Sequence, residues 1–364
     1  MRRTSLGAAI VIVFFMMIRS AAQPTVTTLG GATFTRRPGS GPGGAVLDVG
    51  PAGGWMSQAV GAPSVIRERS RYSMWFTGVQ TTGPGESPYL FRSAIGLATS
   101  RDGMRWDVQN GAQPVLPPGA PGTFDALATG QPSVLRERGR YLMWYGGADG
   151  SQAADSVRIE RIGLAESRDG LRWTRLNGGR PVLDIGAAGS VDSTQATGPY
   201  VLRVGGEYLM WYGAFNGKHS IAAARSADGL TWTKIPVSGL GEQEALGPAV
   251  YARRGEFLML YSIPLDGRWT MVAATSRDGR QWTRLKSGSP LLPPAAPGSF
   301  DAADKGQNHS VHPSEPVWDG RRLRIWYMAE APVAPFPQRI GLMEAILDGR
   351  AHPAEIDLPR GRVK

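Results

Sequence analysis

Cysteine is absent from the 364 residues, so the chain can form neither a disulfide framework nor a cysteine-based metal site. Histidine is scarce, with four residues in all. Long apolar runs are lacking too, because no stretch after the N-terminal segment of residues 6–18 could span a membrane. Without disulfides, the core alone must stabilise the folded protein.

The first 22 residues differ in pattern from the rest. A basic start, an apolar stretch over residues 6–18 and small residues at positions 20–22 are typical of a secretory signal peptide, with cleavage after Ala22. The alternative, an uncleaved membrane anchor, is disfavoured because the apolar run is short. We therefore expect a secreted or periplasmic protein with one folded domain over residues 23–350 and a C-terminal tail over residues 351–364.

The chain is basic, with a net charge of +10 that falls to +7 once Arg2, Arg3 and Arg19 leave with the signal. A basic surface can attract nucleic acid or another anionic polymer. Here, however, the arginines gather in short turns with an acid between them, as in residues 67–69 and 136–138. Solvated turns and export both argue against nucleic acid. We expect a monomer without a membrane span after cleavage.

An aromatic segment recurs five times along the chain. Its copies begin at residues 72, 141, 208, 257 and 323, which are 69, 67, 49 and 66 residues apart. The chain is therefore built from internal repeats. The copy Tyr-Leu-Met-Trp-Tyr at residues 141–145 is typical of a strand with apolar side chains on both faces. One repeat could not bury both faces, so neighbouring repeats must stack on it.

Each repeat contains four segments that resemble strands. In the second repeat the first is at residues 132–135, the second is the aromatic strand, the third is Ile-Gly-Leu-Ala at residues 162–165, and the fourth follows an Asp-Gly turn. Asp in such a turn bonds its own backbone, and Gly accepts a positive φ. We therefore expect a structural role for the four turn aspartates, Asp102, Asp169, Asp228 and Asp278.

The fifth repeat lacks its fourth strand, and the N-terminus offers a replacement. Residues 32–37 resemble residues 171–175 of the second repeat, and both lead to a Val-Leu-Asp sequence. We predict an all-β, five-bladed β-propeller with four antiparallel strands per blade, in which the N-terminal strand closes the last blade. The long loops all fall on one face, which is where we expect function.

Carboxylates that precede the first strands are expected around the mouth of the propeller axis. Asp125, Asp192 and Asp301 occupy matching positions in three repeats, so they either support their loops or contact substrate. Glu244 and Glu315 each occur in one repeat, and chemistry needs such asymmetry. The predicted catalytic residues are Asp125, Asp192, Glu244 and Glu315.

Residues 307–315 form the most polar stretch on this face, although a hydrogen-bonded loop is the alternative interpretation. Aromatic residues nearby could stack on sugar rings or pack between blades. The predicted substrate-binding residues are Asp301, His309, His312, Gln131, Trp55 and Phe124. Two histidines three residues apart near an acid are a weak metal signal. We therefore predict no cofactor, with a central metal ion as the alternative.

These repeated motifs, Pro-x-Val, Tyr-Leu-Met-Trp-Tyr, Ile-Gly-Leu-Ala and Ser-Arg-Asp-Gly-x-x-Trp, resemble the five-bladed β-propeller glycosidase superfamily of arabinanases, xylosidases, invertases and mannoside phosphorylases. Members of that group place an Asp base or nucleophile in the first blade, a second Asp in the next and a Glu acid in the third. The first repeat here has no acid at that position. With the blade numbering rotated, Asp125, Asp192 and Glu244 fall in successive blades.

The resemblance implies an exported carbohydrate-active protein, and it favours a glycoside hydrolase that acts on an oligo- or polysaccharide with a pair of carboxyl groups. The alternative is a non-catalytic propeller that binds a saccharide or a protein. The Ser-x-Asp-Gly-x-x-Trp motif also looks like the sialidase Asp-box, but it is one residue shorter and sialidases use six blades.

Overall fold

The structure is a computed structural model of the chain. It describes residues 27–29, 32–80, 91–153, 157–241, 244–253, 255–265, 267–285, 291–292, 295–302, 311–314, 316–319, 322–330 and 338–346. The predicted signal peptide and the predicted tail lie outside the described residues.

Strands make up nearly all the regular structure. They are β1 (Thr27–Leu29), β2 (Ala32–Arg36), β3 (Ala59–Glu68), β4 (Arg71–Val79), β5 (Ser93–Ser100), β6 (Asp107–Val108), β7 (Ala128–Glu137), β8 (Arg140–Ala148), β9 (Arg161–Ser167), β10 (Thr174–Arg175), β11 (Gln195–Val204), β12 (Glu207–Phe215), β13 (His219–Ser226), β14 (Thr233–Ile235), β15 (Leu246–Arg253), β16 (Glu256–Leu265), β17 (Arg268–Ser276), β18 (Trp282–Arg284), β19 (Val311–Pro313), β20 (Val317–Asp319), β21 (Arg322–Glu330) and β22 (Gln338–Ile346). Short 3-10 helices occupy Pro42–Gly44, Asn110–Ala112 and Asn177–Gly179.

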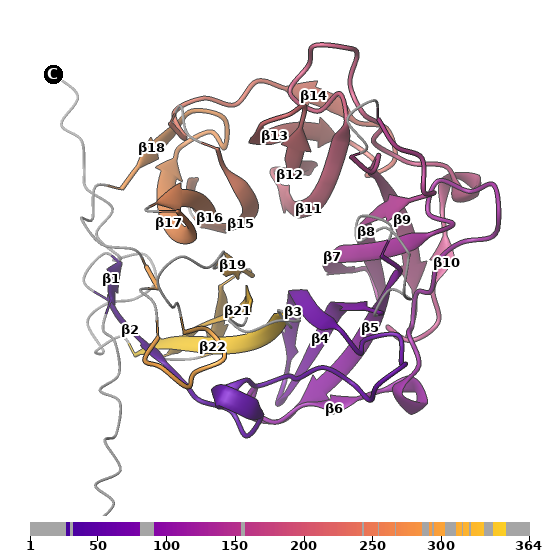
Figure 1. Cartoon of the computed structure of the whole chain (residues 1–364). Coiled ribbons are helices and arrows are strands. Elements are labelled where there is room, and N and C mark those ends of the chain that lie inside the picture. The colour runs from indigo at the N-terminus through magenta and orange to yellow at the C-terminus, as the bar shows by residue number, and fades with distance from the viewer. Residues whose placement is uncertain are drawn as a thin grey trace, which may run out of the picture.

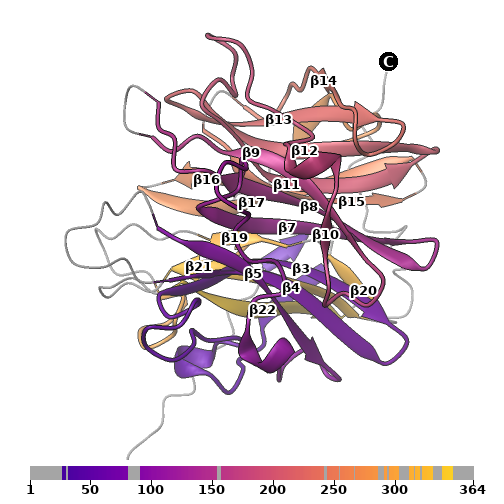
Figure 2. The ribbon, with the colours of Figure 1, turned by 90° about the vertical axis from the view of Figure 1, so that its right-hand side faces the viewer.

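The described strands pair in antiparallel units that follow the chain order. Strands β11 to β14 form one four-stranded sheet and β15 to β18 another. An eight-stranded sheet contains two such units, β3 to β6 and β7 to β10, which meet through one parallel pairing of Ser93 with Ala128. The units follow one another around a ring, and the side view shows them stacked face to face (Figures 1 and 2).

The N-terminal strand completes the last sheet, as the sequence predicted. In β2, Phe34 pairs with Ala345 and Arg36 with Met343 of β22, while β22 pairs in turn with β21. The two ends of the described chain therefore meet in one sheet, and this pairing joins the last unit of the ring to the first part of the chain (Figure 1).

Tryptophans of the aromatic strands lock each unit to a neighbour. Trp75, Trp144, Trp211 and Trp326 are fully buried. Each indole N–H donates to the glycine carbonyl of an Asp-Gly turn in an adjacent unit, at 2.8–3.0 Å. A buried N–H needs such a partner. Both faces of the aromatic strands are therefore covered, as the repeat pattern predicted.

The Asp-Gly turns have the structural role that the sequence predicted. In the turn at residues 226–229, Oδ1 of Asp228 accepts the backbone N–H groups of Leu230 and Thr231 at 2.8 Å, and Oγ of Ser226 accepts the N–H of Gly229 at 2.8 Å. The N–H bond from Thr231 and the one from Leu230 hold the pKa of Asp228 at about 2, because they favour its ionised form. The other three turns repeat these contacts.

No helix within the described parts of the chain is long and apolar enough to cross a membrane.

Candidate functional site

Four of the innermost strands, β3, β7, β11 and β15, carry a bulge at the same place. In β3 the pairing shifts between Gly61 and Ser64, and the other three strands shift at the equivalent point. The residue before the proline then has a positive φ, which is 44° at Ala62, 51° at Gln131, 54° at Gly198 and 66° at Gly247. Glycine accepts this conformation freely, whereas Ala62 and Gln131 hold it at a cost of about 1 kcal/mol. Such strain is typical of functional positions.

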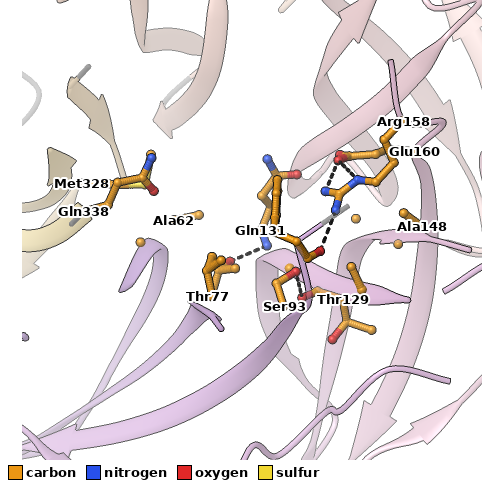
Figure 3. A pocket seen from close by; sticks show the side chains of 17 residues that line it. Ala62, Thr77, Ser93, Thr129, Gln131, Ala148, Arg158, Glu160, Met328 and Gln338 are labelled. Atoms are coloured by element: carbon orange, nitrogen blue, oxygen red, sulfur yellow. Dashed lines mark hydrogen bonds and ion pairs between the residues drawn. The ribbon is translucent and has the colours of Figure 1, made fainter. Parts of the chain in front are cut away.

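These bulged residues line a cavity at the centre of the ring. The cavity has two lobes of about 210 and 260 Å³, and both lobes are lined by Ala62, Gln131, Glu160 and Met328. Figure 3 shows the first lobe, with Glu160 and Arg158 on one side and Met328 and Gln338 on the other. We call the two lobes together the axial cavity.

Glu160 and Arg158 form an ion pair in the wall of the axial cavity. Nε of Arg158 donates to Oε1 of Glu160 at 3.0 Å, and Nη2 donates to the same oxygen. The guanidinium also stacks 4.1 Å from the ring centre of Phe91 and donates to its carbonyl oxygen at 3.2 Å. The side chains of Arg158 and Glu160 are only 9% and 12% exposed. Two sides of the guanidinium are thus fixed, which holds the Glu160 carboxylate in place.

A polar network links Glu160 to the strained Gln131. The hydroxyl of Thr197 contacts both Oε2 of Glu160 and Oε1 of Gln131. Gln131 Oε1 also accepts the N–H of Gly198 at 2.9 Å, and the backbone N–H of Gln131 donates to Oγ1 of Thr77 at 2.7 Å. The side chain of Gln131 therefore bridges two neighbouring units, which is a reason for a non-glycine residue at this bulge.

The second lobe has two histidines in its wall, His219 and His312. The hydroxyl of the buried Ser262 donates to the carbonyl of Val311, so the 3.1 Å contact between Nδ1 of His312 and Oγ of Ser262 uses an Nδ1–H donor. Burial lowers the pKa of His219, and the charge of Glu244 only partly opposes this shift. His219 is therefore neutral at neutral pH.

The charge of the axial cavity is balanced. Among its described lining residues, Arg158 and Glu160 are the only Arg, Lys, Asp or Glu side chains, and they pair with each other. A polar but nearly neutral cavity suits an uncharged ligand with many hydroxyl groups better than a strongly anionic one. No group of three or more His, Asp or Glu side chains suited to a metal ion occurs among the described residues.

The three recurring aspartates lie in a different place from the one expected. Asp125 and Asp301 are fully enclosed, Asp192 is 2% exposed, and none of them lines the axial cavity. Asp125 Oδ2 accepts from the Tyr145 hydroxyl at 2.9 Å and from Nε of Arg175 at 2.7 Å. The equivalent partners are Tyr212 and Lys234 for Asp192, and Tyr327 and Arg36 for Asp301.

This carboxylate–tyrosine–cation set explains why the aspartates recur. Burial would raise the pKa of Asp192, but the hydrogen bonds and charge of Lys234 and the bond from Tyr212 outweigh it, so its pKa is lowered. The pKa of Tyr145 is raised, by burial and by the Asp125 charge. An ionised, fully partnered aspartate of this kind supports its loop, which was one of the two interpretations of the sequence.

The predicted sugar-stacking aromatics are also packing residues. Phe124 lies against Gly147 and Gly163, where an added Cβ would come within 2.5 Å of its ring, and it packs on Tyr145 at 6.0 Å between ring centres. Trp55 covers the equivalent glycines of the first unit and stacks on Phe76 at 5.7 Å. Their rings fill the space that the glycines leave: Phe124 is buried in the core, Trp55 is partly buried against it, and neither lines the axial cavity.

The remaining predicted residues divide into three groups. Gln131 and His312 line the axial cavity, and their contact with a ligand stays a prediction. Glu244 is one step removed, because Oε1 accepts the backbone N–H of the cavity residue His219 at 3.2 Å. Glu315 and His309 lie outside the described residues. The sequence did not predict three residues of the cavity wall and its network, which are Glu160, Arg158 and Thr197. A signal for Glu160 was available, because it occurs in one repeat only and directly precedes the third strand of that repeat, on the face with the long loops.

Comparison with known proteins gives relatives by sequence and neighbours by fold. No protein-family model matches the chain. Two Mycobacterium tuberculosis proteins, "Uncharacterized protein Rv1502" of strain H37Rv and "Uncharacterized protein MT1551" of strain CDC 1551, are each 30% identical over 246 residues, which is 60% of this chain and 75% of theirs. The chain belongs to the family of these two proteins.

Solved structures confirm the likeness in fold to the propeller glycosidases. A structure named "Glycoside hydrolase" superposes with a TM-score of 0.66 and 17% identity over 86% of this chain and 94% of its own. A second structure comes from work on glycoside hydrolases of the GH130 mannoside phosphorylase family that target beta-1,2 mannosidic linkages in Candida mannan. It superposes with a TM-score of 0.65 and 17% identity over 89% of this chain and 95% of its own. Zg3597, a family 117 glycoside hydrolase of Zobellia galactanivorans, superposes with a TM-score of 0.62 and 16% identity over 88% of this chain and 92% of its own.

Proposed function

We propose that the protein is a five-bladed propeller and a glycoside hydrolase that acts on an oligo- or polysaccharide in the axial cavity. The blade count follows if the single Ser93–Ala128 pairing is taken as a contact between two blades. The observation that carries the activity is the position of Glu160, a carboxylate held by an arginine in the wall shared by two lobes. Cleavage of a glycosidic bond needs a carboxyl group between two sugar-binding subsites.

Glu160 replaces the recurring aspartates as the first catalytic candidate. Its Oε2 contacts the Thr197 hydroxyl, and its Oε1 is bound by Arg158, so the group is oriented from both oxygens. Asp125 and Asp192 have comparable partners but do not line the cavity. We assign these two aspartates to loop support.

The second carboxyl group of the proposed pair is Glu315. Residues His312, Pro313 and Ser314 line the second lobe, and Glu315 follows Ser314 in the chain. In such a pair one carboxyl group serves as the acid and the other as the base or nucleophile. Glu244, whose Oε1 accepts the backbone N–H of His219, is then a positioning residue for the backbone that carries this histidine.

The test is the turnover of a panel of plant and microbial glycans by the wild type and by Glu160→Gln and Glu315→Gln. Loss of a general acid or base lowers kcat by about 10²–10⁴-fold, and we expect this from each variant with substrate binding retained. Glu166→Gln is the matched control, since Glu166 pairs with Arg140 and is absent from the lining of the axial cavity. Activity that survives in both test variants contradicts the assignment.

One observation favours a second candidate, a propeller that binds a saccharide without cleaving it. Among the described lining residues Glu160 is the only carboxylate, whereas hydrolysis commonly uses two. Glycan binding by the wild type with no turnover across the panel selects this candidate, and measurable turnover removes it.

We propose further that the protein is exported, on the pattern of residues 1–22, and acts as a monomer without a cofactor. N-terminal sequencing of the exported protein tests cleavage after Ala22. Light scattering tests the monomer, and activity after chelation tests the absence of a required metal.

A further inference from the structure

One tryptophan differs from all the others in what it contacts. Of the 11 tryptophans in the chain, 10 belong to a hydrophobic core cluster or pack against one. Trp269 does neither, and it is only partly buried. A large apolar ring that serves no core leaves surface for a ligand to cover.

Trp269 is the centre of a continuous row of rings. It lies on β17 opposite Pro264, at the tip of the β16–β17 hairpin. Its ring centre is 5.6 Å from that of His219 and 6.5 Å from that of His312. His219 continues the row to Phe215, its cross-strand partner at the tip of the β12–β13 hairpin, at 4.7 Å. All four side chains are partly exposed. We call these four residues the aromatic arc.

The aromatic arc leads into the axial cavity. His219 and His312 are part of the wall of the second lobe, whereas Phe215 and Trp269 are outside the cavity lining. Phe215 belongs to no core cluster either. The arc therefore runs from the lobe, past the β16–β17 hairpin tip, to the β12–β13 hairpin tip, so three successive units contribute to it.

The chemistry of the arc suits the faces of neutral sugar rings. A pyranose presents C–H groups on its faces and hydroxyl groups around its edge, so an aromatic ring can cover the face while the hydroxyl groups stay in water. The imidazole of His219 is buried enough to be neutral at neutral pH, so it adds no strong attraction for anions. The lobe into which the arc leads has the same balanced charge.

We infer that the aromatic arc is a distal subsite for a linear neutral glycan, whose chain continues from the second lobe over His312, Trp269 and His219 to Phe215. This inference rests on the proposed saccharide ligand of the axial cavity, and it names the substrate class as an extended chain. A disaccharide fills the lobes and meets only the two histidines of the arc, while a longer chain also covers Trp269 and Phe215.

The experiment is calorimetric titration with linear manno-, xylo-, cello- and malto-oligosaccharides of two to six units. For the series that binds, the wild-type Kd falls as the chain lengthens. In Trp269→Ala we expect the hexasaccharide to bind about tenfold more weakly, which is the size of one aromatic contact, with disaccharide binding unchanged. In Trp269→Phe, which keeps an aromatic ring, we expect most of the increase in affinity with chain length to be retained. Leu230→Ala is the control, since Leu230 is an exposed apolar residue on an Asp-Gly turn.

The outcomes separate this inference from the proposed activity. Equal hexasaccharide affinity in the wild type and Trp269→Ala overturns the distal subsite, and so does failure of the wild type to bind any chain of the panel. A length-dependent loss in Trp269→Ala supports it even where Glu160→Gln leaves turnover unchanged, a result that removes only the catalytic role of Glu160, and even where the wild type shows no turnover, a result that removes only the hydrolase. Thermal unfolding checks that Trp269→Ala is folded, and we expect a small change because the ring contacts no core cluster.

Discussion

At the scale of single residues, recurrence in the repeats separates the aspartates that support loops from the glutamate that lines the cavity. Asp125, Asp192 and Asp301 recur because each completes the same buried set with a tyrosine and a cation. Glu160 recurs nowhere, and it is the acid that lines the cavity. A ring of similar units needs repeated residues for its architecture and unrepeated ones for chemistry.

Asp228 gives a prediction about pH at this scale. Its pKa is about 2 in the folded protein, compared with 3.8 for an ordinary aspartate, so it stabilises the fold above pH 3.8, and this contribution is lost as the pH falls toward 2. The side chain is mostly solvated, so we expect Asp228→Asn to cost less than about 1 kcal/mol at pH 7. Urea unfolding of the wild type and Asp228→Asn at pH 7 and pH 2.5 measures this difference in the free energy of unfolding. A stability difference between variant and wild type that is equal at both pH values contradicts the role.

Much of the fold could be predicted at the residue scale, and part of the site could not. Gln131 and His312 could be placed near the axis because they belong to the first strands, which line it. Glu160 was not predicted because its place in the wall depends on Thr197, which is 37 residues further along the chain and belongs to the next unit, as well as on its near neighbour Arg158. For Trp55 and Phe124 the sequence left both sugar stacking and packing between blades open, and only the structure shows that their rings fill the space above glycines of neighbouring strands.

At the scale of elements, the interlock between units is the decisive contact. Each of four aromatic strands sends an indole N–H to the turn of a neighbour, and the fourth copy, with Leu260 in place of tryptophan, is the exception. The Asp-Gly turn is thus both a hairpin turn and a receptor for the next unit. The repeat was visible in the sequence, but the partner of each tryptophan was not, because the two residues lie 68 to 223 positions apart.

Trp144→Leu tests this interlock. The substitution imitates the natural Leu260 copy, removes the bond to Gly229 and leaves space in a fully buried position. We expect it to lower the free energy of unfolding by about 2–4 kcal/mol, by comparison with large-to-small core substitutions. Trp318→Leu is the control, since Trp318 is only partly buried. Chemical denaturation measures both, and an equal cost in the two variants contradicts the interlock.

At the scale of the whole molecule, closure of the ring depends on a strand from the far end of the sequence. β2 covers the edge of β22, where Met343 and Ala345 are fully buried, and Arg36 of β2 binds Asp301 in the last unit. Ring closure holds the innermost strands of all units around one cavity, which a set of separate sheets would not provide.

Removal of residues 23–36 tests closure. We expect a lower Tm and self-association, because the deletion exposes the apolar edge of β22 to other chains. Phe34→Ala is the milder variant, with an expected loss of about 3–5 kcal/mol for a buried aromatic ring. Differential scanning calorimetry and light scattering measure these effects. A monomeric truncated protein with an unchanged Tm contradicts the closing role of β2.

The most direct test of the account is a crystal structure of Glu160→Gln with a bound oligosaccharide from the series that the wild type binds. The account predicts a sugar chain that crosses the wall shared by the two lobes, with a glycosidic oxygen within hydrogen-bond distance of residue 160 and further units on Trp269. A chain bound at any other face, with the axial cavity empty of sugar, contradicts it.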